Sequence, residues 1–142
     1  MKKQQFGAGI WHFATYVDRY ATDGYGEPRS VLDAIELAGK VKDLSVVDIN
    51  YPYFGGNFTN EEIKIALDKV NLNVIGITPE IYTKEFRKGA FTNPDSGVRK
   101  RAHELITEAC DAVRFFNAAY VKPVSYTHLR AHETREDLVW RL

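Results

Sequence analysis

The sequence predicts a mixed α/β fold in which strands and helices alternate. Four short segments typical of strands are separated by three segments whose apolar residues recur at helical spacing. No two of these strands are joined by a hairpin turn, and alternation of this kind implies a parallel sheet with right-handed crossover helices. The pattern fits either half of a β/α barrel or a small open doubly wound sheet, and composition does not choose between them.

The first strand is expected at residues 6–13, Phe-Gly-Ala-Gly-Ile-Trp-His-Phe. A loop rich in Tyr, Asp and Gly follows, from Thr15 to Pro28. Ser30 is expected to cap the first helix, because its hydroxyl can accept a backbone N–H that has no partner in the helix. The apolar positions of this helix are Leu32, Ile35, Leu37, Ala38 and Val41.

The second strand is expected at residues 44–49, a β-branched run followed by a loop containing Pro and Gly. The next segment, Thr59-Asn-Glu-Glu62, is a capping-box pattern in which each side chain can satisfy the other residue's backbone N–H. It predicts the start of the second helix. The apolar stripe of that helix consists of Ile63, Ala66, Leu67 and Val70.

A third strand is expected at residues 72–78, stopped by Pro79. Residues 93–95, Asn-Pro-Asp, open the third helix, because proline is favoured in the first helical turn. Asn117 is expected to end this helix in the left-handed conformation, before a fourth strand at residues 119–122. The buried face of the helix is expected to contain Val98, Ala102, Leu105, Ile106, Ala109, Val113 and Phe116.

The composition is that of an ordinary soluble globular protein. The 142 residues are 44% hydrophobic and 27% charged, enough for one domain with a buried core. The 19 basic and 19 acidic side chains balance, which argues against a dedicated nucleic-acid binder. No apolar run reaches the roughly 18–20 residues that cross a bilayer, and the N-terminus lacks the apolar part of a secretory signal. The single cysteine, Cys110, fits a reducing compartment, so a cytoplasmic protein is expected.

Residues 124–142 differ in character from the rest of the chain. Residues 124–134 match a conceptual translation of the transposase-end adapter used in DNA sequencing libraries, and the match resumes after a variable index with Trp140 in place of Cys. We therefore expect an artefactual tail, not a domain, and exclude it from the fold argument. The alternatives are a genuine amphipathic helix and a zinc site at His128 and His132, whose spacing places both imidazoles on one helical face.

Two stretches within residues 1–123 are distinctive. The first, Phe6-Gly-Ala-Gly-Ile-Trp11, resembles the first strand of the xylose isomerase-like TIM-barrel family of sugar isomerases and epimerases, which ends in Gly-x-Trp beside the substrate. Residues 89–99, with the pattern Phe-Thr-x-x-Asp-x-x-x-Arg, resemble the segment of xylose isomerase that carries a substrate-facing Phe. The βα spacing is similar to that family over all of residues 1–123. The resemblance implies an α/β fold that is the first half of a (β/α)8 TIM barrel, truncated at about strand four.

The resemblance also implies a chemistry. Complete barrels of the family bind two divalent cations, Mg, Mn or Co, through carboxylates and a His mainly from strands five to eight. The ions polarise the carbonyl and hydroxyl oxygens of the sugar during a hydride shift or an enediol step. The chain is thus expected to be a fragment of a metal-dependent sugar or sugar-phosphate isomerase or epimerase, inactive as given and binding no metal itself. The expected partner is a small-molecule sugar, with no nucleic acid or membrane, and oligomerisation of the intact protein is left open.

The apolar candidates for substrate binding lie at the first strand and before the third helix. The resemblance implies that Trp11 forms an apolar wall of the sugar pocket and that Phe91 is its neighbour. Core packing is the alternative for both residues. His12, next to Trp11, is a further candidate for substrate contact, although a single His at a strand end is more often packed and hydrogen-bonded.

The polar candidates follow the second and third strands. Asp48 and Asn50 sit at the carboxyl end of the second strand, the catalytic rim of a barrel, where they can hydrogen-bond sugar hydroxyls or cap a loop. Glu80 is another carboxylate of this rim, and a solvated loop charge is its commoner role. No residue is assigned as catalytic.

The second-strand exit departs from the xylose isomerase pattern. Xylose isomerases carry a catalytic His and a run of Asp there, whereas this chain has Val47-Asp-Ile-Asn-Tyr51 without a His. The departure favours another branch of the superfamily. Two alternatives stay open: a non-catalytic barrel that binds a small molecule, and, ranked well below, an apurinic endonuclease-like barrel, which needs zinc-binding His residues and a basic DNA face.

Overall fold

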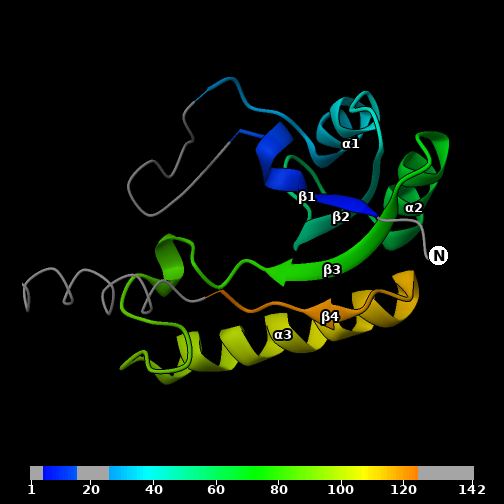
Figure 1. Ribbon diagram of the computed structural model, residues 1–142. Coiled ribbons are helices and arrows are strands. Elements are labelled where there is room, and N and C mark those ends of the chain that lie inside the picture. The colour runs from blue at the N-terminus through cyan, green and yellow to red at the C-terminus, as the bar shows by residue number, and fades with distance from the viewer. Residues whose placement is uncertain (1–4, 16–25, 125–142) are drawn as a thin grey trace, which may run out of the picture.

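Helices and strands alternate along the chain (Figure 1), and the computed structural model describes residues 5–15 and 26–124. The elements are β1 (Phe6–Gly9), η1 (Ile10–Phe13), α1 (Val31–Gly39), β2 (Leu44–Tyr51), α2 (Asn60–Lys69), β3 (Asn73–Pro79), η2 (Lys84–Phe86), α3 (Ser96–Phe116) and β4 (Tyr120–Val121). The predicted artefactual tail lies outside the described residues from residue 125 onward, as do His128 and His132 with their alternative zinc site.

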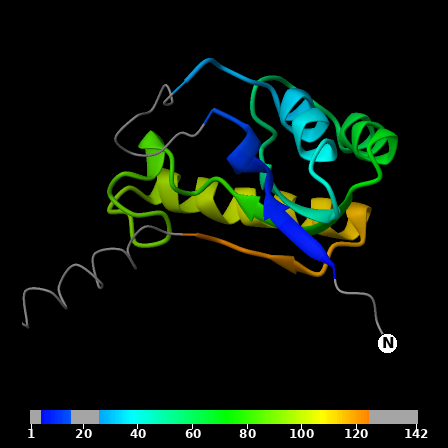
Figure 2. The same cartoon turned by 45° about the horizontal axis from the view of Figure 1, so that its top comes forward.

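The four strands form one parallel sheet in the order β1-β2-β3-β4, so their order in space is their order along the chain. Helix α1 contacts α2, and α2 contacts α3. In Figure 2, α3 lies behind the strands, with α1 and α2 beside each other. The predicted α/β class, with a parallel sheet and alternating helices, is confirmed. No helix among the described residues is long and apolar enough to cross a membrane.

The first strand is shorter than the sequence predicted. It ends at Gly9, and residues 10–13 form the short helix η1, so the predicted strand over residues 6–13 is wrong in its second half. The turn places the ring of Trp11 against Gly9, where a Cβ would lie 2.1 Å from a ring carbon. Only glycine leaves room for this close approach, and the chain turns because Ile10 is fully buried while Trp11 folds back.

The predicted starts of α1 and α2 and the predicted end of α3 are confirmed, whereas Pro94 precedes the Asp95 cap of α3 and lies outside its first turn. Ser30 and Asp33 form a capping box at the start of α1, and Thr59 and Glu62 form another at the start of α2. In each box the hydroxyl accepts the backbone N–H of the acidic residue, whose carboxylate accepts the backbone N–H of the cap. Asn117 ends α3 with φ 51° and ψ 40°, the left-handed conformation.

The main core lies between the sheet and the helices. Ile10, Val47, Ile49 and Ile77 of the strand side are fully buried, and so are the helical residues that face them: Val31, Ala34, Ala38, Ile63 and Ala109. A smaller cluster joins the loop after β3 to the first half of α3: Ile81, Phe86, Ala90, Ala102 and Leu105. Removing this apolar surface from water drives the layers together and fixes the positions of the strand ends.

Candidate functional site

A cavity of about 360 Å³ lies at the carboxyl ends of the strands. Its lining comes from the last residues of β2 and β3, from the segments that follow the four strands, and from the loop before α1: Trp11, Ala14, Thr15, Pro28, Arg29, Asn50, Phe54, Gly55, Thr78, Glu80, Tyr82, Lys122 and Val124. Parallel strands that are neighbours in one sheet bring their carboxyl ends to one edge, so residues far apart in the sequence meet here. Open α/β sheets and barrels both place ligands at this edge.

Asp48 is the centre of a polar network that ties three strands together at this edge. Its side chain is 6% exposed, and the Thr78 hydroxyl donates to Oδ1 at 2.6 Å. The Tyr120 phenol donates to Oδ2 at 3.1 Å, and the Lys122 ammonium lies 2.9 Å from the same oxygen. The network satisfies a charge that would be costly to bury alone. Asp48 does not line the cavity, but its contacts fix the positions of Thr78 and Lys122, which do.

Lys122 also connects the last strand to the first. Its ammonium lies 4.6 Å from the ring centroid of Trp11, within the range of a cation–π interaction. The indole thus contacts both the backbone at Gly9 and the Lys122 ammonium. The aromatic ring of Trp11 forms an apolar part of the cavity wall.

Asn50, Tyr82 and Glu80 make a second polar group on the cavity wall. The Asn50 amide nitrogen donates to the Tyr82 phenol oxygen at 2.6 Å, and this phenol donates to Glu80 Oε1 at 3.5 Å. Asn50 is 2% exposed, and its Oδ1 is buried with no hydrogen-bond partner among the described residues. The backbone N–H of Glu80 donates to the Tyr51 carbonyl at 2.8 Å, which fixes the start of the segment after β3.

Burial raises the pKa of Glu80 from 4.5 to about 7, against a smaller lowering by the Tyr82 hydrogen bond. No ion pair with Glu80 occurs among the residues that the structure describes. A carboxyl group that titrates near neutral pH can exchange a proton with a bound molecule, and such groups are frequent in functional sites.

The structure brings four of the six predicted residues to this edge: Trp11, Asp48, Asn50 and Glu80. Asp48 does not line the cavity itself but contacts the lining residues Thr78 and Lys122, whereas Trp11, Asn50 and Glu80 line it directly. His12 is exposed, with its ring 5.8 Å from that of Trp11, and does not line the cavity.

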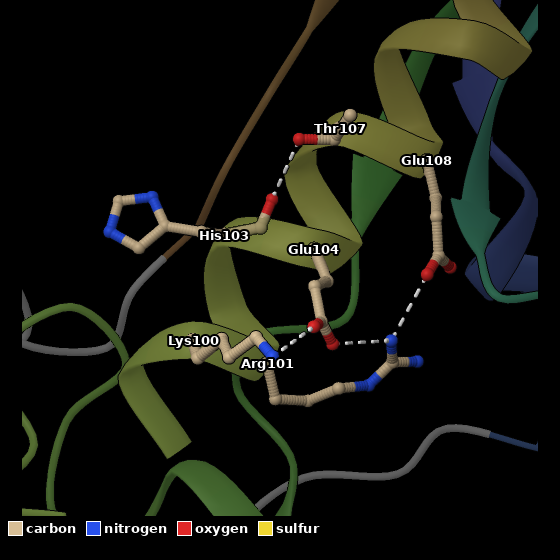
Figure 3. Close-up of polar contacts among 6 residues, drawn as sticks. All are labelled: Lys100, Arg101, His103, Glu104, Thr107 and Glu108. Atoms are coloured by element: carbon tan, nitrogen blue, oxygen red, sulfur yellow. Dashed lines mark hydrogen bonds and ion pairs between the residues drawn. The ribbon is translucent and has the colours of Figure 1, made fainter. Parts of the chain in front are cut away.

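Phe91 lies away from the cavity, in the loop before α3. It is 39% exposed and its ring lies 5.2 Å from that of His103. Figure 3 shows His103 on α3, projecting away from the ion pairs of Arg101 on the same helix. Among the described residues, Phe91 is therefore not a neighbour of Trp11 in the cavity.

Arg101 is the centre of a separate polar cluster on α3 (Figure 3). Its guanidinium lies 3.0 Å from Glu108 and 3.6 Å from Glu104, and Lys100 lies 3.7 Å from Glu104. These side chains are all more than a third exposed. The two pairs with Glu104 are spaced three and four residues apart, as is typical of helix-stabilising contacts, and the pair with Glu108 spans two turns of the helix. The cluster explains how a solvated helix face is stabilised and adds nothing to the cavity.

Ten of the lining residues were absent from the sequence prediction, among them the polar residues Arg29, Thr78, Tyr82 and Lys122. Thr78 and Lys122 are detectable in principle, because each ends a predicted strand and the carboxyl ends of parallel strands meet. Tyr82 and Arg29 belong to connecting segments, whose course over the sheet edge depends on tertiary packing.

The carboxylates at this edge do not form a divalent-cation site by themselves. Asp48 already accepts from two hydroxyls and an ammonium, so its oxygens are engaged and its charge is neutralised. Glu80 is then the remaining carboxylate among the described lining residues, and cations such as Mg²⁺ need several oxygen ligands. Within residues 5–15 and 26–124, no three His, Cys, Asp or Glu side chains converge as metal ligands.

Comparison with known proteins does not assign a family. No protein-family model matches the chain, and no curated protein sequence matches it.

Proposed function

We propose that this chain is the first half of a (β/α)8 barrel. The consecutive strand order supports the proposal, because a doubly wound sheet reverses its strand order at a switch point. Consecutive right-handed crossovers place successive helices on the same face of the sheet. In agreement with this, α1 contacts α2 and α2 contacts α3. A cavity at the carboxyl ends of the strands is the other feature that barrels share.

Within that barrel, the cavity binds a small sugar or sugar phosphate, and the complete protein is a metal-dependent isomerase or epimerase. The observation that carries the proposal is the combination of a fixed aromatic wall, Trp11, with hydrogen-bonding groups from the ends of neighbouring strands, Asn50 and Glu80. Sugars present apolar C–H faces and hydroxyl edges, which match such a lining. Arg29 and Lys122 line the same cavity and supply positive charge for the oxygens of a sugar or its phosphate.

The residues described here bind and orient the ligand. Trp11 packs against an apolar face of the sugar, Asn50 accepts or donates hydrogen bonds to hydroxyls, and Glu80 holds or releases a proton near neutral pH. When bound, divalent cations would polarise the carbonyl and hydroxyl oxygens, and their ligands would come from the rest of the barrel. A barrel without those ligands would be a non-catalytic binding protein, the second candidate, and the lining described here serves both.

Tryptophan fluorescence tests the binding step directly. The chain has two tryptophans, so the variant Trp140→Phe leaves Trp11 as the only indole emitter. Titration of this variant with D-xylose, D-glucose and their phosphates should shift or quench the Trp11 emission in a saturable way. The dicarboxylate succinate, which has no hydroxyl groups, is the control ligand. If no sugar or sugar phosphate changes the emission, the proposed sugar site is wrong.

Sequencing of the source locus by a method without transposase tags tests the assignment to a longer barrel. The reading frame after Lys122 is expected to continue into further strands that carry carboxylate and His ligands. A locus that encodes residues 124–142 followed by a stop codon would contradict the adapter interpretation and return attention to His128 and His132. A continued barrel without such ligands would favour the non-catalytic binding protein.

A further inference from the structure

The hydrogen-bond chain from Asn50 through Tyr82 to Glu80 has a direction. The Tyr82 phenol oxygen accepts from the Asn50 amide nitrogen at 2.6 Å and donates its own proton toward Glu80 Oε1, which is 3.5 Å away. The side chains at both ends of this hydrogen-bonded series therefore present an acceptor: the amide oxygen of Asn50 and the carboxylate of Glu80. All three residues line the cavity.

The Asn50 amide oxygen is the stronger indication of a ligand. It is buried and has no donor among the described residues, although the same side chain is hydrogen-bonded through its nitrogen. A buried acceptor without a donor costs free energy, and native proteins rarely leave one unsatisfied without a bound molecule to complete it. Because Asn50 lines the cavity, a molecule in the cavity can bring the missing donor.

Glu80 is the second acceptor. The other charged groups among the described lining residues do not pair with Glu80: Lys122 lies 2.9 Å from Asp48, and Arg29 donates to the Phe13 carbonyl at 3.2 Å. No cation among the described residues pairs with the Glu80 carboxylate, and burial raises its pKa to about 7. The Tyr82 phenol supplies one long hydrogen bond, which leaves the carboxylate oxygens able to accept further donors.

We propose that this part of the cavity is a subsite for two neighbouring hydroxyl groups of a polyol, one donating to Asn50 Oδ1 and the other to the Glu80 carboxylate. The inference rests on the proposed sugar-binding function and specifies which polar atoms select the ligand. Tyr82 acts as a positioning residue that links the two acceptors. A ligand that presents only acceptors to this wall, such as a carboxylate, is disfavoured.

The subsite makes binding depend on pH with a definite sign. A hydroxyl donates to the ionised carboxylate, so binding favours the deprotonated form of Glu80. Affinity should therefore rise as the pH increases through about 7 and become constant above it. Below that pH, the affinity should fall by roughly tenfold per unit, the limit for a ligand that binds one protonation state.

The test compares xylitol, whose hydroxyls are all vicinal, with 1,3,5-pentanetriol, which has the same carbon chain but no vicinal pair. Binding to the Trp140→Phe chain is followed by Trp11 emission between pH 5.5 and 8.5, a range of about three units around neutrality. We expect xylitol to bind at least about tenfold more tightly than the triol above pH 7, with the pH dependence described. Glu80→Gln should abolish that dependence, and Asn50→Leu should weaken xylitol binding at every pH.

Two matched variants serve as controls. Glu85→Gln removes an exposed carboxylate of η2, and Asn57→Leu removes an exposed amide after β2; neither residue lines the cavity, and both variants should bind as the parent does. Tyr82→Phe, which keeps the ring, should weaken binding less than Asn50→Leu.

The outcomes separate this inference from the sugar-binding function. Saturable xylitol binding that is independent of pH, or unchanged in Glu80→Gln and Asn50→Leu, would keep the sugar site and overturn the subsite, leaving a bound water as the missing donor of Asn50. Absence of binding by any sugar or polyol overturns both.

Discussion

Asp48 shows how a single charge is held at the edge of the sheet. Its nearly buried carboxylate has one cationic partner, Lys122, and two hydroxyl donors, Thr78 and Tyr120. Replacing Lys122 by Met removes the cation and leaves the carboxylate buried with hydroxyls alone. We expect the free energy of unfolding in urea to fall by about 1–3 kcal/mol, the cost of an uncompensated polar group.

The variant that combines Asp48→Asn with Lys122→Met should recover part of that loss, because the amide keeps hydrogen-bonding capacity without the charge. Lys100→Met is the matched control: Lys100 is 80% exposed on α3 and its ion pair with Glu104 is 3.7 Å long. Exposed pairs contribute at most about 1 kcal/mol, so this variant should be near neutral. An equal loss in the two lysine variants would contradict the importance of the Asp48 network.

Glu80 gives a pH dependence of stability that differs from that of a salt-bridged carboxylate. Its pKa is about 7 in the folded chain and 4.5 in the unfolded one, so the folded state binds the proton more tightly. The free energy of unfolding should therefore fall as the pH rises from 4.5 to 7, by at most about 3 kcal/mol, and then level off.

Urea denaturation of the parent chain and of Glu80→Gln, measured across this range, isolates the contribution of the one carboxyl group. The glutamine variant should lack this fall, because its side chain does not titrate. Glu85→Gln, which changes an exposed carboxylate, should retain it. A fall of the same size in both variants would show that Glu80 titrates normally.

At the scale of elements, the start of α2 depends on its capping box. The Thr59 hydroxyl accepts from the Glu62 backbone N–H, while the Glu62 carboxylate accepts from that of Thr59 at 2.8 Å. Thr59→Ala should lower the free energy of unfolding by about 1 kcal/mol, because one N–H of the first turn loses its acceptor. Thr107→Ala, an exposed position inside α3, should be neutral or slightly stabilising, since alanine is the better helix former. Similar losses in both variants, measured by thermal denaturation, would exclude capping as the cause.

The contact of β3 with β4 depends on a glycine. A Cβ on Gly76 would lie 2.1 Å from the ring of Tyr120, so alanine would displace the ring and break its hydrogen bond to Asp48. We expect Gly76→Ala to cost about 1–3 kcal/mol of unfolding free energy, the usual penalty of overpacking. Gly26→Ala, where a Cβ meets no atom within 4 Å, should be neutral or stabilising.

Local patterns of the sequence predicted the elements well because the physics of each is local. The Ser30 cap, the Thr59–Glu62 capping box and the left-handed Asn117 depend on residues a few positions apart, and each is confirmed. The end of β1 at Gly9 was missed, since the turn depends on how Trp11 packs in three dimensions.

The candidate site was predictable where it follows strand ends and not elsewhere. Asn50 and Glu80 were found because the carboxyl ends of parallel strands meet at one edge. The contacts of Lys122 with Asp48 and Trp11 join residues more than seventy positions apart. Tyr82 lies in the segment after β3 and reaches Asn50 because of the path that this segment takes. Such contacts arise from tertiary packing, which periodicity does not report.

At the scale of the whole molecule, the described sheet has two open edges. β1 pairs with β2 alone and β4 with β3 alone, so both outer strands carry unpaired backbone groups. Phe6 on β1 is 54% exposed and Tyr120 on β4 is 40% exposed. Open edges with exposed apolar side chains favour pairing between chains.

The purified chain should therefore be poorly soluble and self-associate with increasing concentration, as sedimentation velocity would show. Phe6→Lys, which places a charge on the β1 edge, should reduce the association. Ile65→Lys, an equally exposed apolar residue on α2 away from both edges, is the control and should have less effect. A chain that stays monomeric over the whole concentration range would contradict edge pairing.

Catalytic silence is the second consequence of the proposed half barrel. The cavity presents binding groups from four strand ends, but Asp48 is engaged by Lys122 and Glu80 is left as a lone carboxylate, so the described residues do not complete a divalent-cation site. Purified chain supplied with Mg²⁺ or Mn²⁺ should bind sugars in the fluorescence titration without converting aldose to ketose, as followed by NMR of the sugar. Because binding and turnover are measured on the same preparation, loss of folding is distinguished from lack of catalytic groups. Turnover that depends on the added metal and disappears in Glu80→Gln would show that this chain carries a complete active site.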